Sequence, residues 1–202
     1  MLEIRDLKAS ELKEAANVFA RSMRDNPLNI AAWQLEDNAR QKALASFYES
    51  VGPGLLNRGS MLGAFQAGIL VGVCIIHPPA QCQPSTIEKL RILSTVLLSG
   101  NLKAIPHILQ WAGVWSQHDP KHPHWHIGGL AVDPPFQGQG IGGQLMIAFC
   151  ERVDRCNGQA YLETDKQRHV GFYQRYGFHV NSESQVLGVP NWFMMRPSQN
   201  SA

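Results

Sequence analysis

Hydrophobic and polar positions follow two different periods along the chain, and the places where the period changes mark the boundaries of the predicted elements. Apolar residues three and four positions apart predict helices, whereas short apolar or β-branched runs predict strands. The resulting strands are 2–7, 61–66, 69–76, 125–132, 160–164, 178–180 and 192–195, and the helices are 10–26, 31–48, 86–99, 102–117, 140–155 and 169–176.

Residues with strong local preferences set several of these boundaries. Ser10 is expected to cap the first helix, because a serine side chain can accept a hydrogen bond from the first turn. The Gly-Pro-Gly run at 52–54 is expected to close the second helical region. Residues 67–68, Ala-Gly, predict a hairpin turn, and Pro106 must lie in the first turn of its helix or kink it.

Composition and charge indicate one globular α/β domain with a mixed sheet. At 202 residues and 44% hydrophobic, the chain is long enough to bury a substantial core, and no repeat or linker divides it. The formal charge of +2 is spread out, so no nucleic acid or membrane surface is implied as a partner. The most apolar stretch, 63–76, is too short to span a bilayer, and residues 1–6 lack a secretory signal, so we expect a cytoplasmic protein.

The four cysteines show no C-x-x-C pair, which is the spacing that a structural zinc site usually provides. Two of them stand in apolar surroundings that are typical of reduced, buried thiols. We therefore expect neither disulfides nor a bound metal at Cys74, Cys82, Cys150 and Cys156.

A dense glycine turn between a predicted strand and a predicted helix is the strongest chemical signal. Glycine lets the backbone approach a ligand closely, and the free N–H groups of a helix start favour a phosphate. Two of the glycines lie inside the first helical turn, where each costs about 1 kcal/mol relative to alanine, so a plain tight turn explains them poorly. The candidate pyrophosphate site comprises Gln137, Gly138, Gln139, Gly140, Ile141, Gly142 and Gly143.

A nicotinamide dinucleotide is the rival ligand for this turn. Residues 138–143 also satisfy G-x-G-x-x-G, and Glu163 follows at the distance of a ribose-binding acid. That motif usually opens a series of parallel units, whereas here few residues remain after it and they predict an antiparallel pair. A Walker A loop is excluded because no Lys-Ser or Lys-Thr follows.

Two blocks of sequence resemble the GNAT superfamily of N-acetyltransferases. Residues 130–142, LAVDPPFQGQGIG, resemble its acetyl-CoA signature, and LET at 162–164 with FYQRYGF at 172–178 resembles its next strand and helix. The strongest match covers 124–196 and is nearest in style to puromycin N-acetyltransferase-like members. The resemblance implies one N-acetyltransferase domain over 1–202, with a mixed, mostly antiparallel twisted sheet flanked by helices, and a helical insertion at about 84–118.

The same resemblance implies roles for individual residues, with acetyl-CoA as the cosubstrate. Tyr173 would protonate the departing thiolate, since a phenol with a pKa near 10 stays protonated at neutral pH. The strand at Leu130, Ala131 and Val132 would splay from its neighbour and offer backbone N–H groups to pantetheine and the thioester carbonyl. Further cofactor contacts are implied at Phe172 and at His169, where these relatives often carry asparagine.

The base that removes the amine proton has two candidates. His124 and His126 alternate on the incoming strand and would share a face with Leu130 if the alternation persists. His126 could accept the proton directly or through water, and Glu163, at a strand end beside the cleft, could do the same. A metal is the weaker use of these histidines.

The acceptor is expected to be the amine of a small molecule, and the assembly a monomer or homodimer. The helical insertion favours a covered pocket over an open peptide groove. Acetylation of a protein or peptide, a non-catalytic acyl-CoA sensor and a nicotinamide-dependent oxidoreductase remain as alternatives. The aromatic residues that could cover the acceptor side of the cleft are Trp33, Phe47, Tyr48, Trp111 and Trp115.

Overall fold

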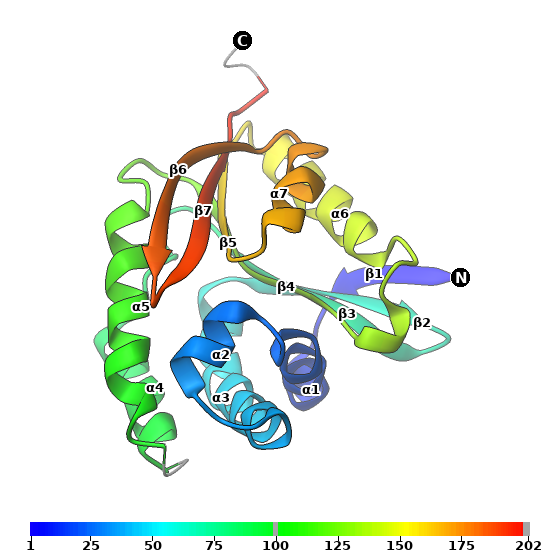
Figure 1. The fold of residues 1–202 in the computed structure, drawn as a ribbon. Coiled ribbons are helices and arrows are strands. Elements are labelled where there is room, and N and C mark those ends of the chain that lie inside the picture. The colour runs from blue at the N-terminus through cyan, green and yellow to red at the C-terminus, as the bar shows by residue number, and fades with distance from the viewer. Residues whose placement is uncertain (99–100, 200–202) are drawn as a thin grey trace.

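The computed structural model describes residues 1–98 and 101–199 and contains the predicted alternation of strands and helices (Figure 1). The strands are β1 (Leu2–Asp6), β2 (Ser60–Gln66), β3 (Ile69–His77), β4 (Trp125–Val132), β5 (Ala160–Thr164), β6 (His179–Val186) and β7 (Val189–Arg196). The helices are α1 (Leu12–Met23), α2 (Pro27–Trp33), α3 (Asp37–Arg58), α4 (Thr86–Leu98), α5 (Ala104–His118), α6 (Ile141–Arg155) and α7 (Gln167–Gln174).

The strands form one seven-stranded sheet in the order β1-β2-β3-β4-β5-β7-β6. Every neighbouring pair is antiparallel except β4 and β5, which are parallel. These two central strands are paired only at Trp125 with Ala160 and at His126 with Tyr161. Beyond His126 the two strands diverge, so the sheet opens at its centre (Figure 1). The fold is the expected mixed, mostly antiparallel sheet, and it is not the doubly wound parallel sheet of a dinucleotide-binding domain.

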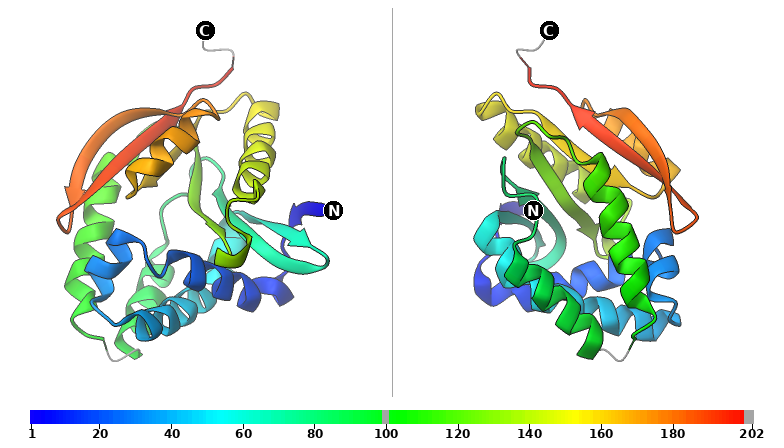
Figure 2. Two further views of the ribbon diagram at one scale, coloured as in Figure 1. Left: turned by 45° about the vertical axis from the view of Figure 1, so that its right-hand side comes forward. Right: turned by 90° about the vertical axis from the view of Figure 1, so that its left-hand side faces the viewer.

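Helices cover the two faces of the sheet unequally. One face packs against α6 and α7, around a buried cluster that includes Leu145, Phe149 and Leu162. On the other face α1 packs over β3 and β4, with α3 beyond it, and α5 lies along β6. Helices α4 and α5 form the far side of the molecule from α6, as Figure 2 shows. No helix among the described residues combines the length and apolar character that a bilayer crossing requires.

Helix α3 departs from the expectation that the Gly-Pro-Gly run at 52–54 would end it. The helix passes through Pro53 and continues to Arg58. Gly52 lies against Leu12 of α1, where an added Cβ would be 3.5 Å from Leu12 Cδ2, and Gly54 lies against Glu88 of α4. The glycines therefore allow close helix packing, and this tertiary burial outweighs the backbone hydrogen bond that Pro53 removes.

The start of α1 also differs from expectation. Ser10 does not cap it, because Ser10 lies inside a short 3-10 turn, Ala9–Glu11, that precedes the helix. Instead the Glu11 carboxylate accepts a hydrogen bond from the backbone N–H of Lys8 at 2.8 Å and pairs with Arg5 at 2.6 Å. The single helix expected at 31–48 is two helices, separated where Gln34 adopts a left-handed φ of 50°.

Candidate active site

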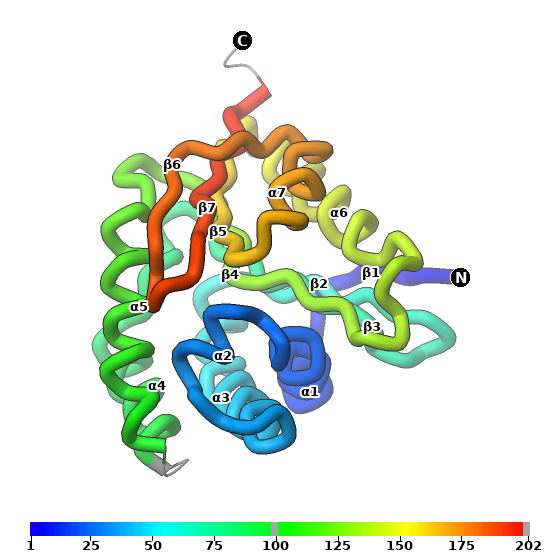
Figure 3. Tube along the Cα trace, in the orientation of Figure 1, coloured from blue at the N-terminus to red at the C-terminus, as the bar shows by residue number. Residues whose placement is uncertain are grey.

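The glycine turn leads from β4 into α6, as the chain path in Figure 3 shows, and its residues 137–140 are exposed. Gly138 and Gly140 have φ values of 77° and 82°, and no atom lies within 4 Å of a Cβ built on either residue. These positions favour glycine because other L-residues are strained there, and the open space beside them leaves room for a ligand. Gly140 is the N-cap of α6, so the first N–H groups of that helix point toward this space.

The other residues of the turn support its backbone. The side-chain amides of Gln137 and Gln139 donate to the carbonyl oxygens of Val132 and Pro135, at 2.9 and 3.3 Å. The Ile141 side chain is buried in the core. In this arrangement these three residues would meet a phosphate through backbone N–H groups rather than side chains.

Helix α7 packs directly against the first turn of α6. A Cβ on Gly142 would lie 3.7 Å from Phe172 Cζ, and one on Gly143 would lie 2.7 Å from the Tyr176 hydroxyl. A side chain at position 143 would therefore have to displace the Tyr176 hydroxyl, whereas position 142 leaves ordinary contact distance. This packing places Phe172 beside the first turn of α6.

The strand residues Leu130, Ala131 and Val132 lie beyond the point where β4 and β5 separate. Their β5-facing backbone edge is consequently not paired with β5, while Ala131 is fully buried under α1. One expectation about this strand is wrong, since His126 does not share a face with Leu130. A bulge at Gly128 shifts the register, because Ile75 pairs with Gly129 while Ile76 pairs with Ile127.

Tyr173 lies on α7, with its ring packed against Phe172 and Phe178. Burial raises the pKa of its phenol above the ordinary value, and Cys74, Asp165 and Glu163 add to the shift. The hydroxyl is therefore protonated at neutral pH, and it has no hydrogen-bond partner among the described residues. His169, one turn earlier, has a pKa lowered to about 4 by burial and by Lys166 and Arg168, so it is neutral there.

His126 and Glu163 meet on the opposite face of the sheet. His126 Nε2 lies 2.8 Å from Glu163 Oε2, and their side chains are only 12% and 4% exposed. Burial lowers the pKa of His126, but the Glu163 carboxylate and the Cys82 sulfur outweigh it and raise that pKa to about 10. His124 faces the same region, and its Nε2 lies 3.2 Å from Asp119 Oδ1.

A cavity of about 500 Å³ opens above this pair, between α4 and α5. Its floor is polar and includes Cys82, Asp119, His126 and Glu163, whereas its walls are largely apolar. Trp115 lines the cavity and donates its Nε1–H to Asn191 at 3.2 Å, but Trp33 and Phe47 pack together in a buried cluster. The apolar wall residues are Ile92, Leu93, Val96, Ile105, Ile108 and Leu109.

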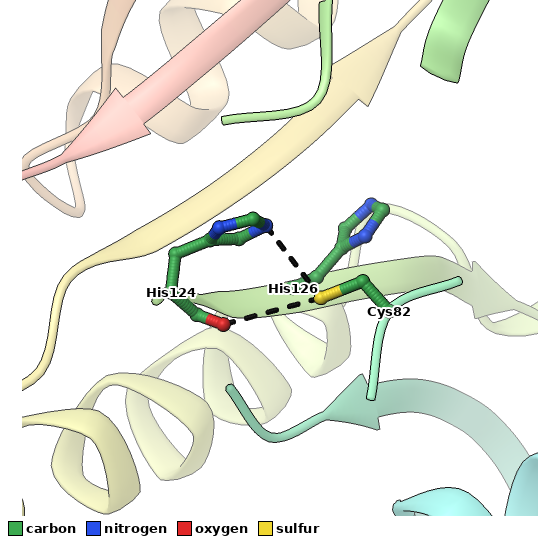
Figure 4. A group of neighbouring side chains, drawn as sticks. All are labelled: Cys82, His124 and His126. Atoms are coloured by element: carbon green, nitrogen blue, oxygen red, sulfur yellow. Dashed lines mark hydrogen bonds between the residues drawn. The ribbon is translucent and has the colours of Figure 1, made fainter. Parts of the chain in front are cut away.

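Sequence reasoning missed Cys82, Gln83 and Asp119 as cavity residues. All three lie in the segments that flank α4 and α5, far from the glycine turn and without a motif of their own. Cys82 Sγ lies 3.5 Å from His124 Nε2, although the two residues are 42 positions apart (Figure 4). All four cysteines are free thiols, as expected.

The comparison with protein families agrees with this geometry. A family model described as the acetyltransferase (GNAT) family matches residues 26–178. The chain belongs to the GNAT family. It is accordingly an N-acetyltransferase that uses acetyl-CoA as the acetyl donor.

Solved structures of GNAT proteins share the fold over nearly the whole chain. A protein described as histone acetyltransferase HPA2 and related acetyltransferase, from Corynebacterium glutamicum, has a TM-score of 0.76 at 18% identity, covering 98% of this chain and 96% of that one. PaiA N-acetyltransferase from Thermoplasma acidophilum, in complex with coenzyme A, has a TM-score of 0.62 at 15% identity (98% and 99% covered). Drosophila melanogaster polyamine N-acetyltransferase has a TM-score of 0.60 at 16% identity (96% and 99% covered).

Proposed function

We propose that this GNAT enzyme acetylates the primary amine of a small molecule with an apolar body, which binds in the cavity between α4 and α5. The observation that carries the proposal is the position of the Glu163–His126 pair on the floor of that cavity. A carboxylate there attracts an alkylammonium group, and the apolar walls accommodate the rest of the molecule.

The two substrates would approach from opposite faces of the sheet. The glycine turn and the α6 start fit the pyrophosphate of acetyl-CoA, because Gly138 and Gly140 leave space that a side chain would fill. The unpaired edge of β4 fits the pantetheine arm, with His169 and Phe172 beside it. The opening between β4 and β5 is then the passage through which the thioester meets the amine.

The reaction needs one proton acceptor and one proton donor. We assign the acceptor role to Glu163: its carboxylate lines the cavity and accepts the His126 Nε2–H, so His126 holds the carboxylate in place. The ammonium first loses one proton to solvent. The neutral amine nitrogen then adds to the acetyl carbon, Glu163 takes the second nitrogen proton, and the carbon–sulfur bond breaks as Tyr173 gives its hydroxyl proton to the leaving thiolate. Glu163 afterwards releases its proton to solvent and the Tyr173 phenolate takes one up, and backbone N–H groups of 130–132 would stabilise the oxyanion formed on addition.

A panel of amines tests the acceptor class. Initial rates of CoA release would be measured with compact arylalkyl and alkyl primary amines, with agmatine and spermidine, and with peptides that carry a free N-terminus or a lysine. We expect the lowest KM among the compact apolar amines, because the cavity walls are apolar. Turnover of peptides alone would contradict the proposal.

The alternative of a non-catalytic acyl-CoA sensor gives a different result in the same assay. A sensor would bind acetyl-CoA and raise the melting temperature, but no amine would release CoA above the rate of hydrolysis.

A further inference from the structure

The polar floor of the cavity contains a cluster of potential metal ligands, of which the proposed acetyl transfer uses only His126. The sulfur of Cys82 and one ring nitrogen each from His124 and His126 all lie within 4.8 Å of one another (Figure 4). The three residues come from the segment after β3 and from the start of β4. Asp119, at the end of α5, joins them through His124.

Hydrogen bonding within the protein leaves this cluster incomplete. His126 Nδ1 is buried and has no hydrogen-bond partner among the described residues. Asp119 Oδ1 is buried as well, and its neighbour of opposite charge is His124 Nε2 at 3.2 Å. A buried polar atom without a partner costs about 1–3 kcal/mol, so the His126 nitrogen needs an explanation. A cation coordinated by His126 Nδ1 beside Asp119 and His124 would supply it.

The outer atoms of the same side chains are already held. His124 Nδ1 lies 2.9 Å from the carbonyl oxygen of His122, which directs the Nε2 lone pair toward Cys82. His126 Nε2 is bonded to Glu163, which leaves Nδ1 as the free ring nitrogen. Gln83 donates to Asp119 Oδ2 at 2.6 Å, which leaves Oδ1. Such outer hydrogen bonds are what orient the ligands of a protein metal site.

The spacing of these atoms matches a tetrahedral zinc centre. With zinc–sulfur and zinc–nitrogen bonds of about 2.3 and 2.0 Å, a tetrahedral angle separates sulfur from nitrogen by about 3.5 Å and nitrogen from oxygen by about 3.3 Å. Cys82 Sγ lies 3.5 Å from His124 Nε2, and Asp119 Oδ1 lies 3.2 Å from the same nitrogen. One ring nitrogen of His126 lies within 4.8 Å of the Cys82 sulfur and of the His124 ligand nitrogen.

We propose that Cys82, His124, His126 and Asp119 bind one Zn²⁺ ion at the floor of the cavity. Thiolate and imidazole ligands favour zinc over magnesium or calcium, which prefer oxygen. Binding releases to solvent the protons that these ligands carry in the free protein. From the sequence we expected no metal because C-x-x-C spacing is lacking, but the fold brings Cys82 to the histidines without it.

Cobalt substitution of the full-length protein tests the site without relying on enzyme activity. The protein is stripped with a chelator and titrated with Co²⁺, and we expect one equivalent to produce the visible bands of tetrahedral cobalt and a near-ultraviolet thiolate band. Added Zn²⁺ should displace it, whereas Mg²⁺ should not. Absence of these bands in the wild-type protein would overturn the proposal, whatever its amine substrate.

Matched variants locate the ion. Cys82→Ser should remove the thiolate band, and His124→Gln should weaken zinc binding at least 100-fold, whereas Cys156→Ser, at an exposed thiol elsewhere, should change neither. Circular dichroism of each stripped variant shows that it is folded. A thiolate band that survives Cys82→Ser, or zinc affinity that His124→Gln leaves unchanged, would place the metal elsewhere and contradict the assignment.

Discussion

The residues on the two sides of the opening between β4 and β5 are distributed differently along the sequence. The face toward α6 and α7 is built mainly from two short stretches, 130–143 and 169–176, whose residues are close in sequence and carry recognisable glycine and aromatic patterns. The cavity on the other face takes residues from the segment before α4, from α4 and α5 themselves, and from β4 and β5. The proposed acetyl-CoA site therefore has a recognisable local sequence pattern, whereas the proposed acceptor pocket is formed by segments that are distant in sequence.

The largest expected effect is on the donor face. Gly140→Leu places a side chain at a left-handed φ of 82° in the space proposed for the pyrophosphate, and we expect acetyl-CoA affinity to fall at least 100-fold. Isothermal titration with CoA measures it. Gly188→Leu is the matched control, since its φ of 76° imposes similar strain in the β6–β7 turn, far from the site. Equal binding by Gly140→Leu and wild type would refute the phosphate assignment.

The second-largest effect is expected from removing the hydroxyl of Tyr173, the proposed proton donor. Tyr173→Phe deletes only the hydroxyl, and we expect kcat to fall about 100-fold, within the range for general acid catalysis, while acetyl-CoA affinity is retained. Tyr48→Phe is the control because Tyr48, on α3, is a partly buried tyrosine that stacks on Phe19 of α1. If both variants keep wild-type kcat, Tyr173 is only a packing residue.

Glu163→Gln tests the proton acceptor on the acceptor face. Glutamine can still accept the His126 Nε2–H, so the local hydrogen bond survives while the basic carboxylate is lost. We expect kcat to fall about 30- to 100-fold. Glu183→Gln, an exposed change on β6, should leave kcat unchanged. An unchanged kcat together with an altered KM for acetyl-CoA would show that Glu163 acts on the donor side instead.

Only part of the candidate site has a pattern that is visible in the sequence. The glycine turn and Tyr173 could be proposed from the sequence because their patterns are contiguous and the backbone geometry they require is local. The cavity floor could not, since Cys82 and Asp119 meet His124 only through the fold. The bulge at Gly128 is another long-range result: it sets His126 and Leu130 on opposite faces, and strict alternation gives the wrong answer.

A smaller effect is expected from filling the cavity. Gly113 lines it, and no atom lies within 4 Å of a Cβ built there. Gly113→Phe should therefore raise the KM for the amine about tenfold while the KM for acetyl-CoA stays constant. Gly113→Ala is the control and should leave both constants unchanged while stabilising α5 by about 1 kcal/mol. Equal changes in both KM values would mean that the cavity is not specific to the acceptor.

The smallest effect is expected in α3, which the sequence predicted to end at residues 52–54 but which continues to Arg58. Pro53→Ala allows a backbone N–H to donate within α3, while Gly52 and Gly54 keep their close contacts with Leu12 and Glu88. Because one hydrogen bond contributes about 1 kcal/mol net, we expect the free energy of unfolding to rise by about that amount, measured by urea denaturation, with acetyl-CoA binding unchanged. A loss of stability would mean that Pro53 itself favours the native backbone.

The most direct test of the two-face arrangement is a crystal structure with CoA and an amine product. We predict the pyrophosphate on the backbone N–H groups of 138–143, the sulfur in the opening between β4 and β5 within hydrogen-bond distance of the Tyr173 hydroxyl, and the amide nitrogen on the Glu163 side. CoA and product bound on the same face of the sheet, or a sulfur remote from Tyr173, would contradict the account.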